Sequence, residues 1–165
     1  MKLKEEQILS SVEISRTFDV CTNRGIRYKG SLRRGIQHVI LVAAFRKSPE
    51  DFTLNPYVDM KIGDKIFYTG EGRFGKQKMA RGKLVLKRQI KEKYPLYVFE
   101  KKSPGIYAFL GRYDVLGMRK EVQADAEGRE REVFFELSKV HGSVAVNGVA
   151  RGKYIRNLGV YSKSK

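Results

Sequence analysis

Two tyrosines and one aspartate carry the chemistry that stands out in this chain. Tyr57, Asp59 and Tyr68 flank a turn predicted at residues 61–64. A planar base that has left a nucleic-acid stack can lie between two aromatic rings, and stacking contributes about 1–3 kcal/mol per base. A carboxylate accepts a hydrogen bond from the exocyclic amine of cytosine, whereas thymine presents an acceptor at that position. The three residues therefore predict a pocket for one extruded cytosine, with Asp59 selecting the base.

Each of these residues also has an ordinary structural interpretation. Tyrosines in strands usually pack on a sheet or in a core, and an aspartate beside a turn can cap it. The combination of two rings and one carboxylate favours the pocket more than any single residue does. Backbone near Thr69 and Gly70 is expected to form a dry niche for a methyl group. One methyl contributes only about 1 kcal/mol, so we expect a modest preference for the modified base.

The segment that follows the tyrosines has the composition of a phosphate-binding loop. Gly70, Gly72 and Gly75 allow backbone N–H groups to approach an anion closely. A helix with a basic outer face is predicted over 77–93. Cations in the loop and helix would position a duplex and make its binding sensitive to salt. The residues predicted to contact DNA here are Gly72, Arg73, Phe74, Lys76, Lys78, Arg81, Lys83, Lys87 and Arg88.

The composition fits a single domain with an anionic partner. The chain has 165 residues, 41% of them hydrophobic, which suffices for one core and is too little for two. Lysine and arginine exceed aspartate and glutamate by 34 to 18, so the formal net charge is +16. This excess favours nucleic acid as the partner. Apolar runs too short to span a bilayer and a charged, non-signal-like start predict a cytoplasmic protein without a membrane partner.

Side chains that commonly bind metals are few. Cys21 is the only cysteine, with His38 and His141 as the only histidines. These counts exclude an internal disulfide framework and a zinc cluster of cysteines and histidines. Because His38 precedes an apolar strand and His141 precedes a glycine, both are interpreted as structural or exposed. We expect no metal, no cofactor and no catalytic residue.

The first third of the chain predicts a helix, a loop and a buried strand. Apolar residues near helical spacing predict a helix over 3–18, and the apolar run 37–45 lacks alternation, which is typical of a strand buried on both faces. Glycines between basic residues predict a loop over 21–35. At its tip, Arg33 and Arg34 are predicted DNA contacts beside an apolar residue that could wedge into a duplex.

The remaining elements are mostly strands. In the strand 65–69, Tyr68 shares a face with Ile66 because side chains alternate. Two further strands form a hairpin around the KKSPG turn, and 131–137 is the last strong strand. The fold class is therefore α+β, a mixed and mainly antiparallel β-barrel flanked by two or three helices. Residues 1–140 are expected to form one domain, followed at 141–165 by a basic C-terminal extension or linker.

Residues 57–86 resemble the SRA (SET- and RING-associated) domain, and most closely its version in prokaryotic modification-dependent restriction endonucleases of the McrA kind. In that family a Tyr-x-Asp element precedes a strand ending in YTGEG or YTGSG, followed by a loop, a glutamine and an Asn-x-Ala-Leu helix. The corresponding text here is Tyr57-Val58-Asp59, FYTGEG at 67–72, Gln77, Gly82 and Leu84.

The resemblance implies an SRA/PUA-like barrel that reads 5-methylcytosine or 5-hydroxymethylcytosine in double-stranded DNA by flipping the base. It implies that the module supplies specificity in a restriction system, with cleavage by a fused or partner nuclease. The base pocket would then be formed by Tyr57, Asp59, Tyr68, Thr69 and Gly70.

Two departures from the family pattern affect the expected DNA contacts. Lys83 stands where the family usually has asparagine, and Lys76 where it often has aspartate, so phosphate contacts would replace local ones. The segment between Gly72 and Gln77 is short compared with the long finger of eukaryotic members. The gap left by the flipped base would have to be filled from Arg73 or Phe74, or from the tip of the 21–35 loop.

Two other functions are compatible with parts of the chain. PUA-like barrels with basic surfaces also bind RNA, so an RNA reader is the main alternative. Glu100-Lys101-Lys102 has the Glu-x-Lys spacing of a metal-dependent nuclease, with Asp64 or Asp59 as a conceivable partner. The triplet leads into a turn, lacks a preceding Pro-Asp element and arises easily in a lysine-rich chain, so the nuclease is the weaker alternative.

Overall fold

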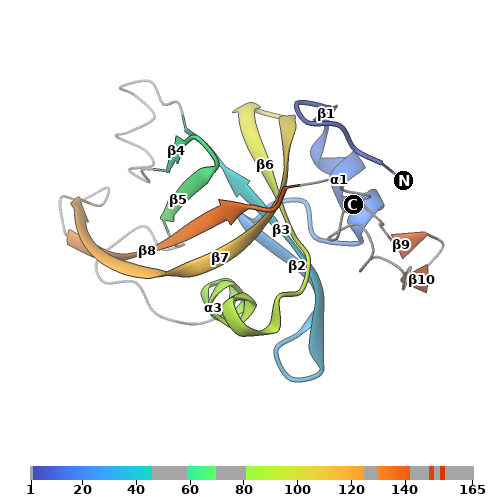
Figure 1. Cartoon of the computed structure of the whole chain (residues 1–165). Coiled ribbons are helices and arrows are strands. Elements are labelled where there is room, and N and C mark those ends of the chain that lie inside the picture. Colours follow the sequence, from blue (N-terminus) through green and yellow to red (C-terminus); the bar gives the residue numbers. More distant parts are fainter. Residues whose placement is uncertain are drawn as a thin grey trace.

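The structure, a computed structural model, describes residues 2–45, 59–69, 81–124, 130–141, 149–150 and 153–154. Within them, eight strands form one sheet that curls into a half-barrel, with helix α1 and helix α3 on different sides of it (Figure 1). Most neighbouring strands are antiparallel. The predicted α+β, mainly antiparallel fold is confirmed.

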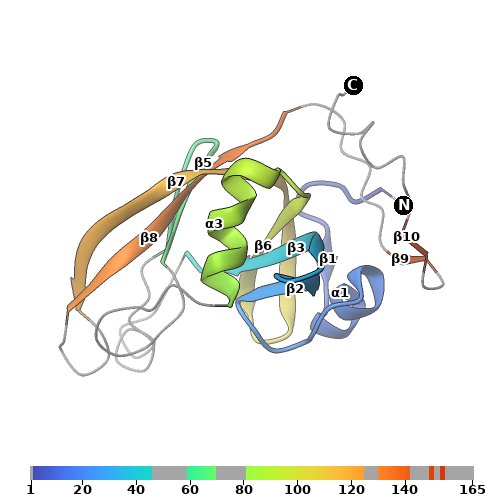
Figure 2. The same ribbon diagram turned by 90° about the horizontal axis from the view of Figure 1, so that it is seen from below.

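The strands follow the order β2-β3-β6-β7-β8-β5-β4, and β1 pairs with β7. The pair β3–β6 is parallel. The long strand β7 pairs with β6 along its first part and with β8 along its second, so it joins the two halves of the curled sheet (Figure 2). The elements are β1 (Ile8–Leu9), α1 (Ser11–Phe18), β2 (Ile26–Ser31), β3 (Gly35–Ala43), β4 (Met60–Ile62), β5 (Lys65–Thr69), α3 (Gly82–Glu92), β6 (Leu96–Ser103), β7 (Ile106–Ala124), β8 (Glu130–Lys139), β9 (Val149–Ala150) and β10 (Lys153–Tyr154).

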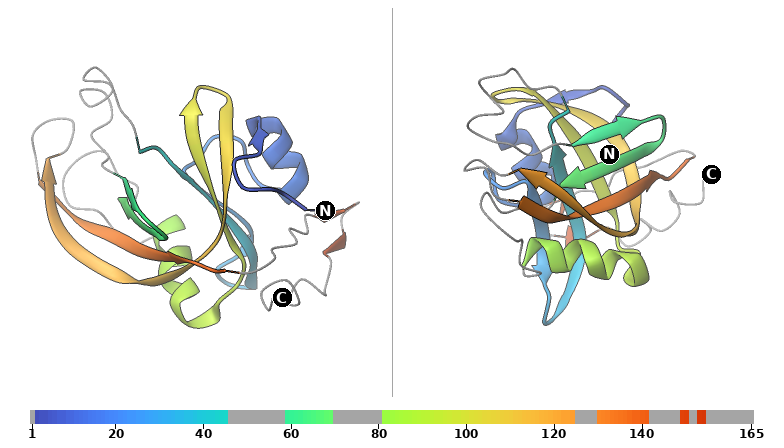
Figure 3. Two further views of the ribbon diagram at one scale, coloured as in Figure 1. Left: turned by 45° about the horizontal axis from the view of Figure 1, so that its top comes forward. Right: turned by 90° about the vertical axis from the view of Figure 1, so that its left-hand side faces the viewer.

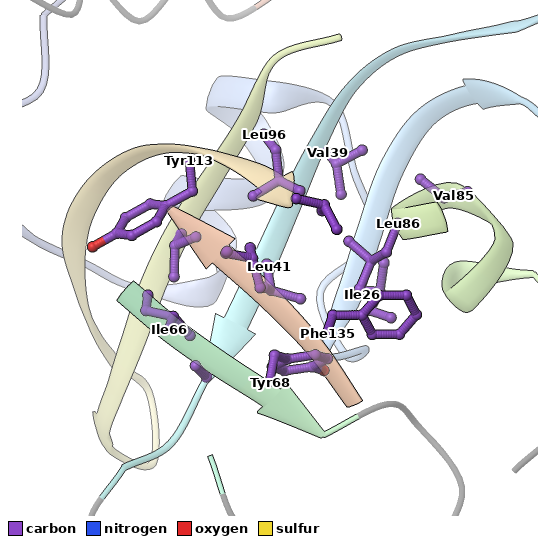
Figure 4. Packing of buried hydrophobic residues seen from close by; sticks show 14 of the residues in the cluster. Ile26, Val39, Leu41, Ile66, Tyr68, Val85, Leu86, Leu96, Tyr113 and Phe135 are labelled. Atoms are coloured by element: carbon purple, nitrogen blue, oxygen red, sulfur yellow. The ribbon is translucent and has the colours of Figure 1, made fainter. Parts of the chain in front are cut away.

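Strand β3 separates two hydrophobic clusters. Val39 and Leu41 pack in the cluster that includes α3 and β5 (Figure 4). Ile40 and Val42 point the other way, to the cluster that contains α1. Because successive side chains of a strand point to opposite faces, an apolar run without alternation is suited to this central position. The predicted strand at 37–45, buried on both faces, is confirmed.

The first helix is shorter than predicted. Helix α1 begins at Ser11 because Ser10 and Glu13 form a capping box: the Ser10 hydroxyl accepts from the Glu13 amide at 3.1 Å, and the Glu13 carboxylate accepts from the Ser10 amide at 2.7 Å. Before the cap, Ile8 pairs with Ala108 of β7. The prediction of a helix over 3–18 is therefore wrong in its first half, where sheet pairing and the cap override apolar spacing.

The predicted loop over 21–35 is also wrong in its middle, where Ile26–Ser31 form strand β2, whereas its tip at 32–34 is a turn. Ile26 is buried in the core, and Tyr28 packs against it. Gly30 sits at an irregularity of the β2–β3 pairing with φ +103°, a conformation that L residues rarely adopt. The glycine that suggested a loop instead permits a bulge within a strand.

Replacing Gly30 by alanine is expected to lower the free energy of unfolding by about 2–4 kcal/mol. The positive φ is strained for any other residue, and an added Cβ would lie 2.2 Å from the Gly35 carbonyl oxygen. Urea denaturation measures the loss. Gly117→Ala is the matched control, because an added Cβ meets nothing within 4 Å there. Equal stability of the two variants would contradict this explanation.

The later elements agree with the sequence. The hairpin of β6 and β7 turns at Pro104 and Gly105, and β8 contains the predicted strand 131–137. Helix α3 begins at Gly82; the part of the predicted helix at 77–80 lies outside the described residues. Among the residues that the structure describes, neither helix has the length and apolar content needed to cross a bilayer.

Candidate nucleic-acid interface

Asp59 joins two strands through its carboxylate. Its Oδ1 accepts a hydrogen bond from the backbone amide of Thr69 at 3.0 Å, and its Oδ2 accepts from that of Ala44 at 3.2 Å. The residue is 7% exposed. These two contacts orient the group, and each oxygen of a carboxylate can accept more than one hydrogen bond. The capping role and a binding role are therefore compatible in the same side chain.

A cavity of about 430 Å³ lies beside Asp59, at the end of β3. Figures 1 and 3 place this end of β3 between β5 and the β6–β7 hairpin. Three predicted pocket residues, Asp59, Tyr68 and Thr69, form part of its lining. The remaining lining residues come from the segment after α1, from β2, β3 and its end, and from the β6–β7 hairpin: Thr22, Asn23, Arg24, Gly25, Arg27, Val42, Ala43, Ala44, Lys101 and Tyr107.

Tyr68 has a structural and a site-facing role. It is 5% exposed and belongs to the same core cluster as Ile66, as the strand alternation predicts. It is paired with Phe135 of β8, and Figure 4 shows the two rings at the same end of the core. A ring anchored this way is held rigidly where it lines the cavity. The other two predicted pocket residues, Tyr57 and Gly70, lie outside the described residues.

The basic helix face is partly as predicted. Arg81, Lys87 and Arg88 are exposed, whereas Lys83 is buried at 6% exposure. Lys83 is three residues before Leu86, and this spacing places both on the buried side of α3. The prediction that Lys83 lies on the outer, DNA-facing side is therefore wrong. The other predicted contacts of this region lie outside the described residues: Gly72, Arg73, Phe74, Lys76 and Lys78.

Arg33 and Arg34 are exposed in the turn between β2 and β3. The turn is held by Ser31, whose hydroxyl accepts from the Arg34 amide at 2.9 Å, and by α3, whose Arg88 donates to the Leu32 carbonyl at 2.6 Å. It precedes β3, while the cavity lies at the other end of that strand. At about 3.3 Å per residue the two are roughly 25 Å apart. This distance argues against the turn as the filler of a gap beside the cavity.

The residues considered for catalysis have structural partners. Glu100 pairs with Lys102 at 3.1 Å, and Asp64 pairs with His141 at 2.7 Å. His38 is buried, contacts the Phe18 carbonyl at 2.5 Å, and has a pKa lowered mainly by burial. No group of three or more histidines, cysteines or acids suited to a metal occurs among the described residues.

Comparison with protein families adds a decisive observation. The family described as "ScoMcrA-like, SRA domain" matches residues 20–148, which include β2, the cavity residues, α3 and all of β6 to β8. The chain belongs to this SRA domain family. The predicted resemblance is thereby confirmed over most of the length. No curated protein sequence matches significantly.

Solved structures share the fold of this SRA domain. The structure of the sulfur-binding and SRA domains of ScoMcrA with phosphorothioated DNA is 16% identical with a TM-score of 0.62; the match covers 96% of this chain and 44% of that one. The SRA domain of SUVH5 with hemimethylated CG DNA is 20% identical with a TM-score of 0.61, covering 88% and 93%. The same domain with fully hydroxymethylated CG DNA is 22% identical, with a TM-score of 0.54 and coverage of 76% and 80%.

The sequence did not reveal one side of the cavity in this SRA domain. Arg24, Arg27, Lys101 and Tyr107 line it, although none was predicted as a site residue. They come from segments about 80 residues apart in the sequence and meet because β2, β3, β6 and β7 are neighbours in the sheet. Arg27 lies in a stretch that its glycines assign to a loop. The stretch shows no strand-like alternation of apolar and polar residues that would have marked Arg27 as part of a strand.

Proposed function

We propose that this SRA domain binds double-stranded DNA and holds one flipped, modified cytosine in the cavity beside Asp59. The observation that carries the proposal is the oriented carboxylate. Two backbone amides hold it at the cavity wall, and a carboxylate oxygen can accept from the exocyclic amine of cytosine. Thymine would place an acceptor against the same group and leave it unsatisfied.

Stacking would offset the cost of removing the base from the duplex. Flipping costs a few kcal/mol, and one stacked base recovers about 1–3 kcal/mol. Tyr68 lines the cavity and is anchored in the core, so its ring requires no ordering on binding. We assign Tyr57 as the ring on the other side, and the backbone of Thr69 and Gly70 as the niche for the modification.

The choice of modified duplex DNA rests on the relatives and on charge. The SUVH5 SRA domain has been solved with methylated and with hydroxymethylated CG DNA. The net charge of +16 suits a polyanion. The exposed cations Arg33, Arg34, Arg81 and Lys87 are proposed to contact phosphates, because such contacts position a duplex without reading its sequence.

A nuclease is the partner that this specificity module would serve. The ScoMcrA chain, whose SRA domain has the same fold, also carries a sulfur-binding domain. The match to the present protein covers 44% of that ScoMcrA chain. We propose that residues 1–140 read the modified base, that 141–165 form an extension, and that a fused or separate nuclease in the cytoplasm cuts the DNA.

The test is a set of matched binding reactions. Fluorescence anisotropy is measured with duplexes that carry cytosine, 5-methylcytosine or 5-hydroxymethylcytosine at one position, and with an RNA duplex of the same sequence. Because one methyl contributes about 1 kcal/mol, the expected preference for the methylated duplex over the unmodified one is about fivefold. Affinity for every duplex should fall steeply, by about a thousandfold between 50 and 200 mM salt if six phosphates are contacted.

Two results would decide against this function. Equal affinity for all DNA duplexes would remove the modified base from the proposal. Tighter binding of RNA than of any DNA would favour a PUA-like RNA reader instead. Magnesium is included in a parallel series, in which cutting that is lost in Glu100→Ala would establish a nuclease.

A further inference from the structure

Three cationic side chains line the cavity together with Asp59. Arg24, Arg27 and Lys101 line it, and Asp59 is the only carboxylate among the described lining residues. Arg24 and Lys101 are exposed, so they lie at the rim, whereas Arg27 is 3% exposed. The cavity thus contains one carboxylate, which the proposed function uses, and three cations, which it does not explain.

Arg27 is held firmly by neutral groups. Its Nε donates to the Arg24 carbonyl at 2.6 Å, and its Nη1 donates to the Ser11 hydroxyl at 3.1 Å. The guanidinium carbon lies 5.6 Å from the centroid of the Tyr107 ring, a cation–π distance. These contacts come from three elements and fix the plane of the guanidinium, and Nη2 donates no hydrogen bond to any residue in the described part of the chain.

The charge of Arg27 has no counter-ion within the described residues. Among the described residues, no carboxylate forms an ion pair with Arg27, Arg24 or Lys101. The nearby Glu100 pairs with Lys102 instead. Asp59 is turned toward the amides of Ala44 and Thr69. A buried cation is costly unless it is paired. An oriented guanidinium whose Nη2 donates to no described residue, beside a cavity open to solvent, is suited to a bound oxyanion.

We propose that Arg27, with Arg24 and Lys101 at the rim, forms an oxyanion subsite in the same cavity that receives the flipped base. The inference rests on the proposed function and deepens it. The oxyanion would be supplied by the bound nucleotide, either as an acidic substituent on the base, such as a carboxyl group at C5, or as the phosphate next to the flipped nucleoside. The first is a planar and the second a tetrahedral oxygen group, and both accept hydrogen bonds from a guanidinium.

The two sources are separated by the choice of duplex. Anisotropy is measured with four duplexes: 5-methylcytosine, 5-carboxylcytosine, and 5-methylcytosine with a neutral methylphosphonate on its 5′ or its 3′ side. Each is tested with the wild type, Lys101→Gln, Arg27→Gln and Arg27→Lys. Lys91→Gln is the control, because it removes an exposed positive charge from α3, which contributes nothing to the cavity lining. Thermal unfolding identifies any variant that is not folded. Because Lys101 is exposed, Lys101→Gln should fold and still tests the subsite if Arg27→Gln does not fold.

We expect the loss of affinity in each variant to depend on whether the duplex carries one particular anionic group. Lys101→Gln and Arg27→Gln should weaken binding about tenfold on duplexes that retain the group. They should have little effect on the duplex that lacks it, and Arg27→Lys should recover part of the loss. Coupling to the carboxyl group identifies the base substituent, whereas coupling to one methylphosphonate position identifies the phosphate.

Equal losses on all four duplexes, matched by Lys91→Gln, would overturn the oxyanion subsite, because they would reflect only the overall charge. That failure is distinct from failure of the proposed function. Failure of the proposed function would appear as equal affinity of the wild type for cytosine and 5-methylcytosine duplexes. The effect of a variant on phosphate binding can be measured with either of these two duplexes.

Discussion

Asp59→Ala is expected to abolish the preference for a modified cytosine over thymine at the same position, while salt-sensitive binding to any duplex remains. The carboxylate is the group proposed to accept from the exocyclic amine, and hydrogen bonds to charged groups contribute about 1.5–3 kcal/mol. The loss should therefore be about 10- to 100-fold in affinity for the modified duplex. Contacts to phosphate are made elsewhere and do not depend on this side chain.

The same substitution should also destabilise the fold, because two amides lose their acceptor. The N–H groups of Ala44 and Thr69 both donate to Asp59, and leaving a buried donor unsatisfied costs about 1–3 kcal/mol. Asp59→Asn separates the two roles. Its one oxygen can still accept from one amide, so it should be more stable than Asp59→Ala, yet it presents an N–H₂ donor that no longer suits cytosine.

Both effects are measured on the same preparations. Anisotropy with duplexes containing 5-methylcytosine or thymine gives the base preference, and urea denaturation gives the stability. Preference retained in a folded Asp59→Asn protein would show that another group selects the base and that the pocket assignment is wrong.

Gln89→Ala is expected to lower the free energy of unfolding by about 3–5 kcal/mol. Gln89 is completely buried and makes three hydrogen bonds, two to strand β7 and one to the segment between α3 and β6. Its Nε2 donates to the Asp114 carboxylate at 2.8 Å and to the Tyr94 carbonyl at 3.1 Å, and its Oε1 accepts from the Val115 amide at 2.8 Å. Alanine would leave all three partners without this contact and create a void beneath the helix.

Two controls show whether the hydrogen bonds carry this effect. Lys91→Ala on the exposed side of the same helix should change stability by less than about 0.5 kcal/mol. Asp114→Asn keeps an oxygen that can accept from Gln89 and should cost much less than Gln89→Ala. Chemical denaturation followed by circular dichroism measures all three variants. A loss in Gln89→Ala no larger than in Lys91→Ala would mean that α3 does not depend on this tether.

Asp59 could be predicted as a site residue from the sequence, whereas the buried role of Gln89 could not. Asp59 was recognisable because it lies two residues after a tyrosine and shortly before FYTGEG, the local pattern that carries the resemblance to the SRA domain. Gln89 lies within a run of basic residues that predicts a solvated helix face, and its buried role depends on strands more than twenty residues further along. A polar residue in such a run has no local feature that marks it as buried.

Local patterns also account for the strands and helices that were predicted correctly. The central strand β3 is a continuous apolar run, and the β6–β7 hairpin has a Pro-Gly turn, so short segments contain all the necessary information. The errors at the first helix and at β2 have the opposite cause. At the first helix, pairing of Ile8–Leu9 with the far strand β7 overrides the apolar spacing before the capping box at Ser10. At β2, pairing with β3 accommodates Gly30 at a bulge, so the glycine content does not break the strand.

The sequence by itself determined the family, the mainly antiparallel α+β fold, the excess of positive charge and the cluster of Asp59 with Tyr68, because each depends on composition or on residues close together in the chain. Only the tertiary structure decided which residues share the cavity with that cluster. Arg27 and Lys101 reach it from β2 and β6, and the sheet order brings these strands to either side of β3. A cavity wall assembled across strand neighbours has no linear pattern, since its spacing is set by strand pairing rather than by the chain.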